Sequence, residues 1–122
     1  MLRLIVGLLA TALVATSASA MDVATFLTKA EALMKKGPMA VFSSDIGLLK
    51  AEMKTGFTQL RSEQVAARKA GRKPASCMPA KVGVSPNELL GHLRSIPASQ
   101  RGMPMKEALG SWMQKKYPCP TS

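Results

Sequence analysis

CMPAKVGVSPNELLGHLRSIPASQRGMPMKEALGSWMQKKYPCP, residues 77–120, is the stretch that decides the fold of this 122-residue chain. It contains the only two cysteines, Cys77 and Cys119, and each has a proline within two positions. Between them lie two amphipathic segments separated by residues 97–104. Two helices joined in this way run antiparallel, so the start of the first lies near the end of the second. The spacing predicts a Cys77–Cys119 disulfide within one chain, with a bridge between two chains as the alternative.

The two segments carry clear helix signals. Ser85-Pro86-Asn87-Glu88 reads as a capping box with proline at the first helical position, and Pro97 ends that helix. Residues 98–103 form a polar connection, and Pro104 is expected in the first turn of the last helix, which breaks at Tyr117-Pro118. The predicted buried faces are Leu89, Leu90, Leu93 and Ile96, then Met105, Ala108, Leu109, Trp112 and Met113.

The first half of the chain predicts two more helices. Asp22 is an N-cap candidate for a helix to Lys36, which Gly37 and Pro38 end. Its apolar face is Val23, Phe26, Leu27, Ala30, Leu33 and Met34. We expect residues 39–42 to fold onto the core as an apolar linker. A longer helix, capped at Ser43 or Ser44, then runs to about Gly71 with an apolar stripe of Ile46, Leu49, Met53, Phe57 and Leu60.

The residues before Met21 have the pattern of a signal peptide. Arg3 is followed by an apolar run over residues 4–14, and Ala18-Ser19-Ala20 suits cleavage between Ala20 and Met21. An uncleaved membrane anchor is the alternative. Cleavage removes 20 of the 122 residues and leaves 102, enough for one small domain over residues 21–122. We therefore predict a single all-α, four-helix domain stapled by one disulfide, periplasmic or secreted, with no stable membrane insertion after cleavage.

A basic cluster ends the long helix. The chain carries a net charge of +10, which falls to +9 when Arg3 is removed, and Arg61, Arg68, Lys69, Arg72 and Lys73 gather beyond the apolar stripe. Cations suit a helix C-terminus, so a solvated end is one interpretation. The other is a patch that binds a partner protein or an envelope polyanion. Nucleic acid is not expected, because the chain is predicted to be exported and no aromatic residue interleaves the cations.

Catalytic and metal-binding patterns are not recognisable in the sequence. His92 is the only histidine, with Glu88 four residues before it, and the predicted disulfide uses both cysteines. The carboxylates are scattered, and no glycine-rich phosphate loop occurs. We interpret His92 as a surface or packing residue, and most methionines as core, although methionines also form adaptable binding surfaces. The expectation is a protein without enzymatic activity or cofactor.

From Cys77 onward the chain resembles the Rap/Tai-type immunity proteins of type VI secretion systems. The resemblance rests on Cys77-Met78-Pro79, the capped helix starting at Ser85 and ending at Pro97, and Tyr117-Pro118-Cys119-Pro120. It implies a helical, disulfide-bonded periplasmic protein that binds and inhibits a cell-wall amidase effector. Residues 21–71 lack the cysteine and the glycine-aromatic motif usual in the family's early helices. A general periplasmic stress or chaperone-like protein without a dedicated effector is the alternative.

Overall fold

A computed structural model describes residues 21–120, so the predicted signal peptide lies outside the described residues. In chain order the elements are α1 (Val23–Lys36), the 3₁₀ helix η1 (Gly37–Phe42), α2 (Ser44–Lys69), α3 (Pro86–Ser95), the 3₁₀ helix η2 (Ala98–Gln100) and α4 (Met105–Lys116). The predicted four-helix, all-α fold is confirmed for residues 21–120. So is the disulfide between Cys77 and Cys119, which lies within one chain.

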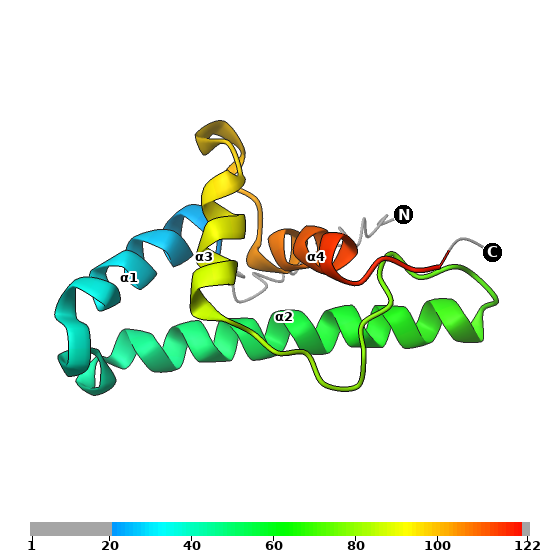
Figure 1. Ribbon diagram of the computed structural model, residues 1–122, viewed down its shortest axis with the longest axis horizontal. Coiled ribbons are helices and arrows are strands. Elements are labelled where there is room, and N and C mark those ends of the chain that lie inside the picture. The colour runs from blue at the N-terminus through cyan, green and yellow to red at the C-terminus, as the bar shows by residue number, and fades with distance from the viewer. Residues whose placement is uncertain (1–20, 121–122) are drawn as a thin grey trace, which may run out of the picture.

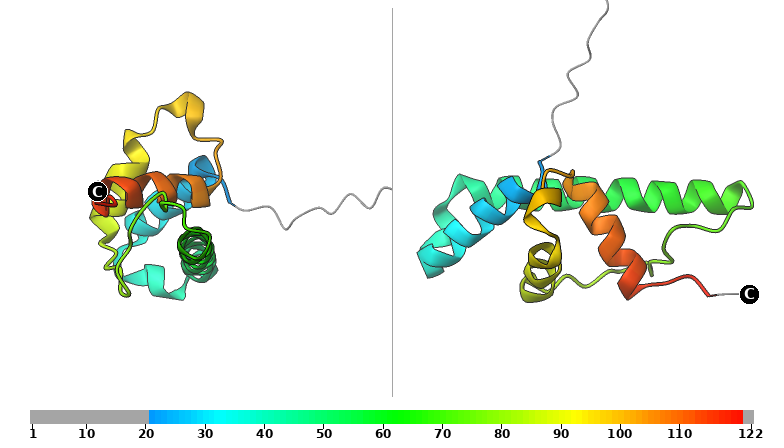
Figure 2. Two further views of the ribbon diagram at one scale, coloured as in Figure 1. Left: turned by 90° about the vertical axis from the view of Figure 1, so that its right-hand side faces the viewer. Right: turned by 90° about the horizontal axis from the view of Figure 1, so that it is seen from above.

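The long helix α2 runs the length of the molecule, and α1 and α4 pack against it (Figure 1). Figure 1 shows it along the longest axis, with α1, α3 and α4 all on one side of it. The same one-sided arrangement is visible when α2 is viewed end-on in the left panel of Figure 2. The core therefore forms between α2 and a layer of three shorter helices, and the opposite face of α2 is open to solvent.

Helix α1 begins and ends where the sequence predicts. The Asp22 carboxylate accepts a hydrogen bond from the Thr25 main-chain nitrogen at 2.7 Å, and hydrogen bonding to Thr25 lowers the pKa of the Asp22 carboxyl. Gly37 follows the last turn at φ 56°, a conformation that glycine adopts without strain. One residue of the predicted buried face is misplaced: Met34 is 55% exposed, because it lies at the margin of the surface that α1 buries.

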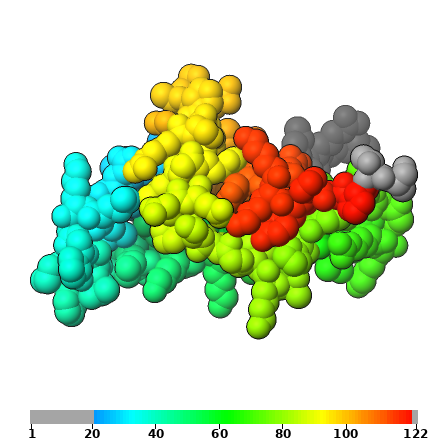
Figure 3. Space-filling view, in the orientation of Figure 1, coloured from blue at the N-terminus to red at the C-terminus, as the bar shows by residue number. Residues whose placement is uncertain are grey.

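Residues 39–42 do not fold onto the core as a linker, so that prediction is wrong. They belong to η1, and only Ala40 packs against the core. Pro38 lies in the first turn of η1, and this tight helix turns the chain back at one end of the molecule. Met39, Val41 and Phe42 point away from the core and are 64%, 66% and 80% exposed. We call these three residues the apolar tip; the cyan end of the molecule in Figure 3 contains it.

The far end of α2 is only partly solvated, although a solvated end was one interpretation of its basic cluster. Gln64 and Ala67 are buried. The Gln64 amide makes two hydrogen bonds to the Met78 main chain, accepting from its nitrogen at 2.8 Å and donating to its carbonyl at 3.2 Å. The loop that carries Cys77 therefore folds back onto α2.

Helix α4 packs mainly on α2, and glycines allow the close approach. A Cβ atom on Gly56 of α2 would lie 2.7 Å from Leu109 Cδ1, and one on Gly110 of α4 would lie 3.4 Å from Leu60 Cδ2. All five apolar residues predicted for the face of α4 are buried, and so are the four predicted for the face of α3. The centre of the core is thus built around α4 rather than around the first two helices.

Helices α3 and α4 are not packed side by side as an antiparallel pair. Figure 1 shows α3 upright and α4 beside it, roughly at right angles to it in this view. The reason is that α4 packs mainly on α2, while α3 packs on α1. The predicted meeting of the two ends still holds, because Lys116 at the end of α4 pairs with Glu88 in the first turn of α3 at 2.8 Å. Beside the disulfide, the Cys77 nitrogen donates to the Tyr117 carbonyl at 2.8 Å.

The predicted capping box at the start of α3 does not form. Ser85 is the N-cap, but its side chain makes no capping hydrogen bond. The Glu88 carboxylate bonds to Lys116 instead of reaching back to Ser85, since the cation offers a stronger, charge-assisted partner. Pro104 was expected in the first turn of the last helix, but it lies one position before that turn, at the N-cap of α4.

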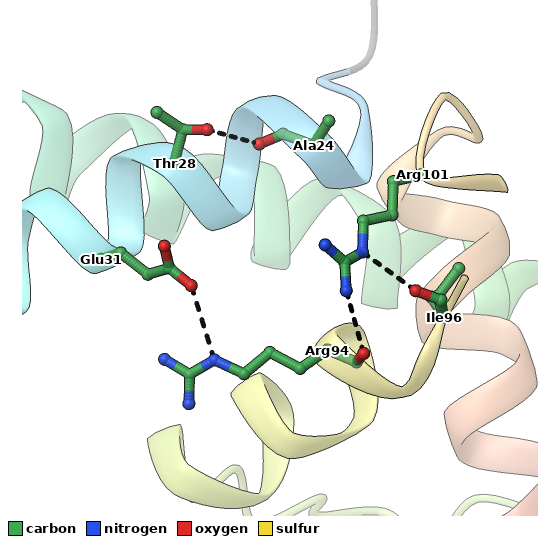
Figure 4. A network of polar contacts seen from close by, with 6 residues as sticks. All are labelled: Ala24, Thr28, Glu31, Arg94, Ile96 and Arg101. Carbon is green, nitrogen blue, oxygen red and sulfur yellow. Dashed lines mark hydrogen bonds and ion pairs between the residues drawn. The ribbon is translucent and has the colours of Figure 1, made fainter. Parts of the chain in front are cut away.

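Polar contacts tie the other end of α3 to α1 and to the connection. Figure 4 shows the Glu31 carboxylate of α1 beside the Arg94 guanidinium, 3.5 Å apart. Arg101 folds back and donates to the Ile96 carbonyl at 2.9 Å and the Arg94 carbonyl at 3.0 Å. These bonds satisfy carbonyl groups that the end of a helix leaves without intrahelical partners. The position of α3 is therefore fixed at both ends.

Candidate functional site

A groove of about 520 Å³ opens where α3 stands away from α2. We call it the apolar groove, because nearly all its lining is hydrocarbon; Phe26, Leu33, Met34, Met53, Leu89 and Leu90 represent its three walls from α1, α2 and α3. Phe26, Leu33, Leu89 and Leu90 are themselves buried and form the floor. Concave, apolar surfaces of this kind are the usual form of a ligand or partner site.

Cations stand at the rim of the apolar groove. Lys50 and Lys54 of α2 line it and are exposed. Lysine stems cover apolar surface while their ammonium groups stay in water. The groove therefore combines an apolar floor with positive charge at its edge, which suits an apolar segment that is flanked by acidic groups.

A second hollow continues from the first along α2. It has a volume of about 590 Å³, and Lys54 and Phe57 line both hollows. Arg61 and Lys69 also line it, with Thr58 and Ser62 between them. We call it the basic groove. All residues that line the basic groove lie on α2, and its lining is still mostly apolar. The two grooves together therefore form one largely apolar surface, on which cations become more frequent toward the end of α2.

The structure separates the five residues predicted as a basic patch. Arg61 and Lys69 line the basic groove, whereas Arg68, Arg72 and Lys73 are exposed outside it. Arg61 is also engaged structurally, because its Nη2 donates to the Pro79 carbonyl at 2.9 Å. Lys54, which sequence reasoning did not single out, takes the place of the three distal cations in the groove.

His92 is a packing residue, in line with its interpretation from the sequence. Its Nε2 lies 2.9 Å from the Ala108 carbonyl, which only accepts, so Nε2 carries the proton. The imidazole stacks on Trp112 with ring centroids 6.1 Å apart. Burial lowers the pKa of His92, although the Ala108 hydrogen bond opposes this effect. Neutral His92 thus joins α3 to α4.

The ammonium group of Lys116 lies over the ring of Trp112 in a cation–π contact. Lys116 Nζ lies 5.5 Å from the Trp112 ring centroid and 5.8 Å from that of Tyr117. The hydrogen bond with Glu88 raises the pKa of Lys116. This cluster holds the ends of α3 and α4 together, next to the disulfide.

No group of three His, Cys, Asp or Glu side chains in residues 21–120 is arranged to hold a metal ion. Within the same range, no helix has the length and apolar character needed to cross a membrane.

Comparison with known proteins gives no match: no family model, no curated protein and no solved structure is significantly similar to this chain.

The apolar groove was not predicted from the sequence. Most of its apolar lining residues were assigned to helix faces, but a stripe at helical spacing does not show whether a neighbouring helix covers it. The available signal was the number of apolar residues in the first half, among them Met34, which lines the groove and is 55% exposed. An excess of such residues indicates surface that is covered by something other than the domain's own core.

Proposed function

We propose that this protein is a non-enzymatic binding protein of the cell envelope, whose surface along α2 binds one partner protein. The observation that carries the proposal is the continuity of the apolar groove with the basic groove through Lys54 and Phe57. An apolar hollow supplies affinity, and adjacent charge supplies selectivity and faster association. The fitting partner presents an apolar segment beside acidic groups.

The partner class follows from the resemblance of the second half to Rap/Tai-type immunity proteins. In this proposal the chain is an immunity-type protein that binds and inhibits a cell-wall amidase effector of a type VI secretion system. The Cys77–Cys119 bridge supports it, because the resemblance requires a disulfide-closed pair of helices. The bridge also supports the periplasmic or secreted location, since disulfides persist in oxidising compartments.

A second function is favoured by the apolar tip. Phe42 is 80% exposed beside Val41 and Met39, and an exposed, methionine-containing apolar surface suits a chaperone-like protein that holds many unfolded clients. The two functions differ in the number of partners: an immunity protein binds one enzyme in a fixed ratio, and a chaperone-like protein binds many.

The test is isolation of the exported chain, tagged after Ser122, from the periplasm together with bound proteins. Expected is a single co-purifying protein that releases peptides from peptidoglycan by amide hydrolysis and that loses this activity when the chain is added back. A captured protein without amidase activity contradicts the immunity proposal. Capture of many unrelated proteins favours the chaperone-like function instead.

Matched variants locate the binding surface. Met34→Arg places a charge in the apolar groove, and Leu48→Arg is its control, since the two residues are 55% and 51% exposed and Leu48 does not line the groove. We expect Met34→Arg to weaken partner binding about tenfold or more, as loss of an interface anchor does, and Leu48→Arg to leave it unchanged. Equal effects of both variants contradict the assignment of the groove.

The four cations at the end of α2 need a variant of their own. Arg68, Lys69, Arg72 and Lys73 are all exposed, so their joint replacement by serine should change stability only modestly. Unchanged stability with slower partner association shows that the charges steer binding. Unchanged association shows that they are solvated surface, and that the partner uses the apolar groove and Lys54.

A further inference from the structure

Glu52 of α2 binds a main-chain nitrogen, whereas other carboxylates of the described chain bind basic side chains. Four acidic residues of the described chain pair with a basic side chain: Glu31 with Arg94, Asp45 with Lys29, Glu63 with Lys106 and Glu88 with Lys116. Glu52 instead accepts a hydrogen bond from the main-chain nitrogen of Met21, with 2.9 Å between that nitrogen and Oε1. Met21 is the residue that the predicted cleavage leaves as the first of the mature chain.

The Met21 nitrogen is held in place by the surrounding main chain. The Met21 carbonyl accepts from the Met105 nitrogen at 2.9 Å, and the Val23 nitrogen donates to the Met103 carbonyl at 3.0 Å. These bonds flank an antiparallel bridge between Asp22 and Pro104. Pro104 lacks an N–H, but the bonds on either side of the bridge use its neighbours, so proline fits here. Both Met21 and Glu52 are partly buried.

We propose that Glu52 is the acceptor for the α-ammonium group of Met21. Cleavage then converts a hydrogen bond from a neutral amide N–H into an ion pair, and this ion pair fixes the start of α1 on α2. Hydrolysis by a signal peptidase adds one water across the Ala20–Met21 peptide bond. The oxygen of the water goes to the Ala20 carboxylate. Its two hydrogens join the one already on the Met21 nitrogen, which becomes –NH₃⁺. The proposal rests on the predicted export and cleavage, and it is independent of the partner.

An ammonium group at this place needs a carboxylate. Met21 directly precedes the N-cap of α1, where the helix dipole is positive and disfavours a second positive charge. The chain itself is strongly basic. The carboxylate of Glu52 offsets both effects at hydrogen-bond distance. Processing therefore adds a charge whose partner is already positioned by α2.

The other charged groups near this corner are engaged elsewhere. The Asp22 carboxylate caps Thr25, and the Arg101 guanidinium binds two carbonyls at the end of α3. Lys106 in the first turn of α4 pairs with Glu63. An ordinary α-amino group has a pKa of about 7.7–8.0, so the Met21 amine is expected to titrate between pH 7 and 9.

The sign of the pH dependence follows from the pairing. A carboxylate neighbour raises the pKa of an ammonium group in the folded state above its unfolded value. The stabilisation is then complete below about pH 7.7 and is lost as the pH rises through the higher folded value. Removing the charge of Glu52 should remove this dependence.

The experiment uses the full chain exported by its own N-terminal segment. Intact mass establishes the first residue, and urea denaturation compares wild type with Glu52→Gln at pH 6.5 to 9. We expect a mass that starts at Met21. We also expect an unfolding equilibrium constant about two- to fivefold larger for the variant at pH 6.5, the range for exposed and partly exposed ion pairs, with the ratio approaching one by pH 9. Glu63→Gln is the control, because the Glu63–Lys106 pair does not include the Met21 amine, so its ratio to wild type should stay constant over the same pH range.

A direct titration keeps the test independent of whether Glu52→Gln folds. Reductive ¹³C-methylation labels the amines of the wild-type protein, and NMR resolves the α-amine from the lysines. A pKa above about 8 for the Met21 amine supports the pair, and a value at or below about 7.7 overturns it. A mature chain that starts at another residue, or a Glu52→Gln ratio that does not change with pH, also overturns it.

Discussion

Gln64 is the residue on which the fold of the 72–84 loop depends most directly. It is 5% exposed, and its amide satisfies both the nitrogen and the carbonyl of Met78, whose side chain is itself buried. Without Gln64 these two main-chain groups remain buried with no replacement partner. An unsatisfied buried polar group costs about 1–3 kcal/mol.

We therefore expect Gln64→Leu to lower the free energy of unfolding by about 1–3 kcal/mol. Urea denaturation measures the change. Gln59→Leu on the same helix is the control, because Gln59 is exposed, and it should cost less than about 0.5 kcal/mol. Equal costs for the two substitutions would show that the amide bonds of Gln64 contribute nothing to stability.

The stability should depend on pH through His92. Burial lowers the pKa of His92 below its ordinary value of 6.5, so the folded state binds a proton less readily than the unfolded state does. Stability is then complete above pH 6.5 and falls as the pH drops from 6.5 toward the lower folded value. His92→Gln, whose amide still donates to Ala108, should lose less stability over the same interval.

NMR titration of the imidazole together with thermal unfolding checks this prediction. The difference in thermal midpoint between wild type and His92→Gln should be constant above about pH 7.5 and change below it. An imidazole pKa at or above 6.5 in the folded protein would contradict the packing role assigned to His92.

Among the elements, α2 and α4 form the closest contact, and Gly56 permits it. A methyl group on Gly56 would meet Leu109, which has no exposed surface and therefore little room to move. Gly91 in α3 has open space around its Cα atom. The two glycines thus separate the effect of packing from the intrinsic preference of helices for alanine.

Gly91→Ala should stabilise the protein by about 0.5–1 kcal/mol, since alanine is the better helix former. Gly56→Ala should destabilise it by about 1–2 kcal/mol, because the overpacking cost exceeds that gain. Denaturant unfolding of both variants provides the measurement. If Gly56→Ala stabilised the protein as much as Gly91→Ala does, α4 would not lie against α2 at this point.

The whole molecule depends on its single disulfide. The Cys77–Cys119 bridge spans 42 residues and closes a loop that contains all of α3 and α4. Cross-linking a loop of this size removes on the order of 4 kcal/mol of unfolded-state entropy in the chain-entropy model. That is a large share of the 5–15 kcal/mol by which a typical domain of this kind is stable.

Replacing both cysteines by serine should therefore lower the free energy of unfolding by roughly 2–5 kcal/mol. Hydrogen exchange should show the largest loss of protection in α3 and α4, because the bridge joins the segments before and after them. Non-reducing electrophoresis of the wild type should give a monomer without free thiols. Uniform loss of protection across α1 and α2 as well would show that the four helices unfold as one unit.

The sequence by itself determined the helices and most of the core. Helical spacing placed all four helices, and the caps predicted for α1 and α2 form, whereas the capping box of α3 does not. Every predicted apolar residue after Ser85 is buried, because helical spacing is a signal local to a few turns. The Cys77–Cys119 pairing was also predictable, since the chain has only two cysteines.

Only the tertiary structure decided how the helices face one another. Gly56 lets α4 approach α2 closely, α3 packs on α1, and the apolar groove stays open beside Leu89 and Leu90. The Met21–Glu52 contact has the same origin, because its two residues are 31 positions apart and neither carries a local signal. Periodicity reports which face of a helix is apolar, and the neighbour that covers it is chosen by packing over the whole chain.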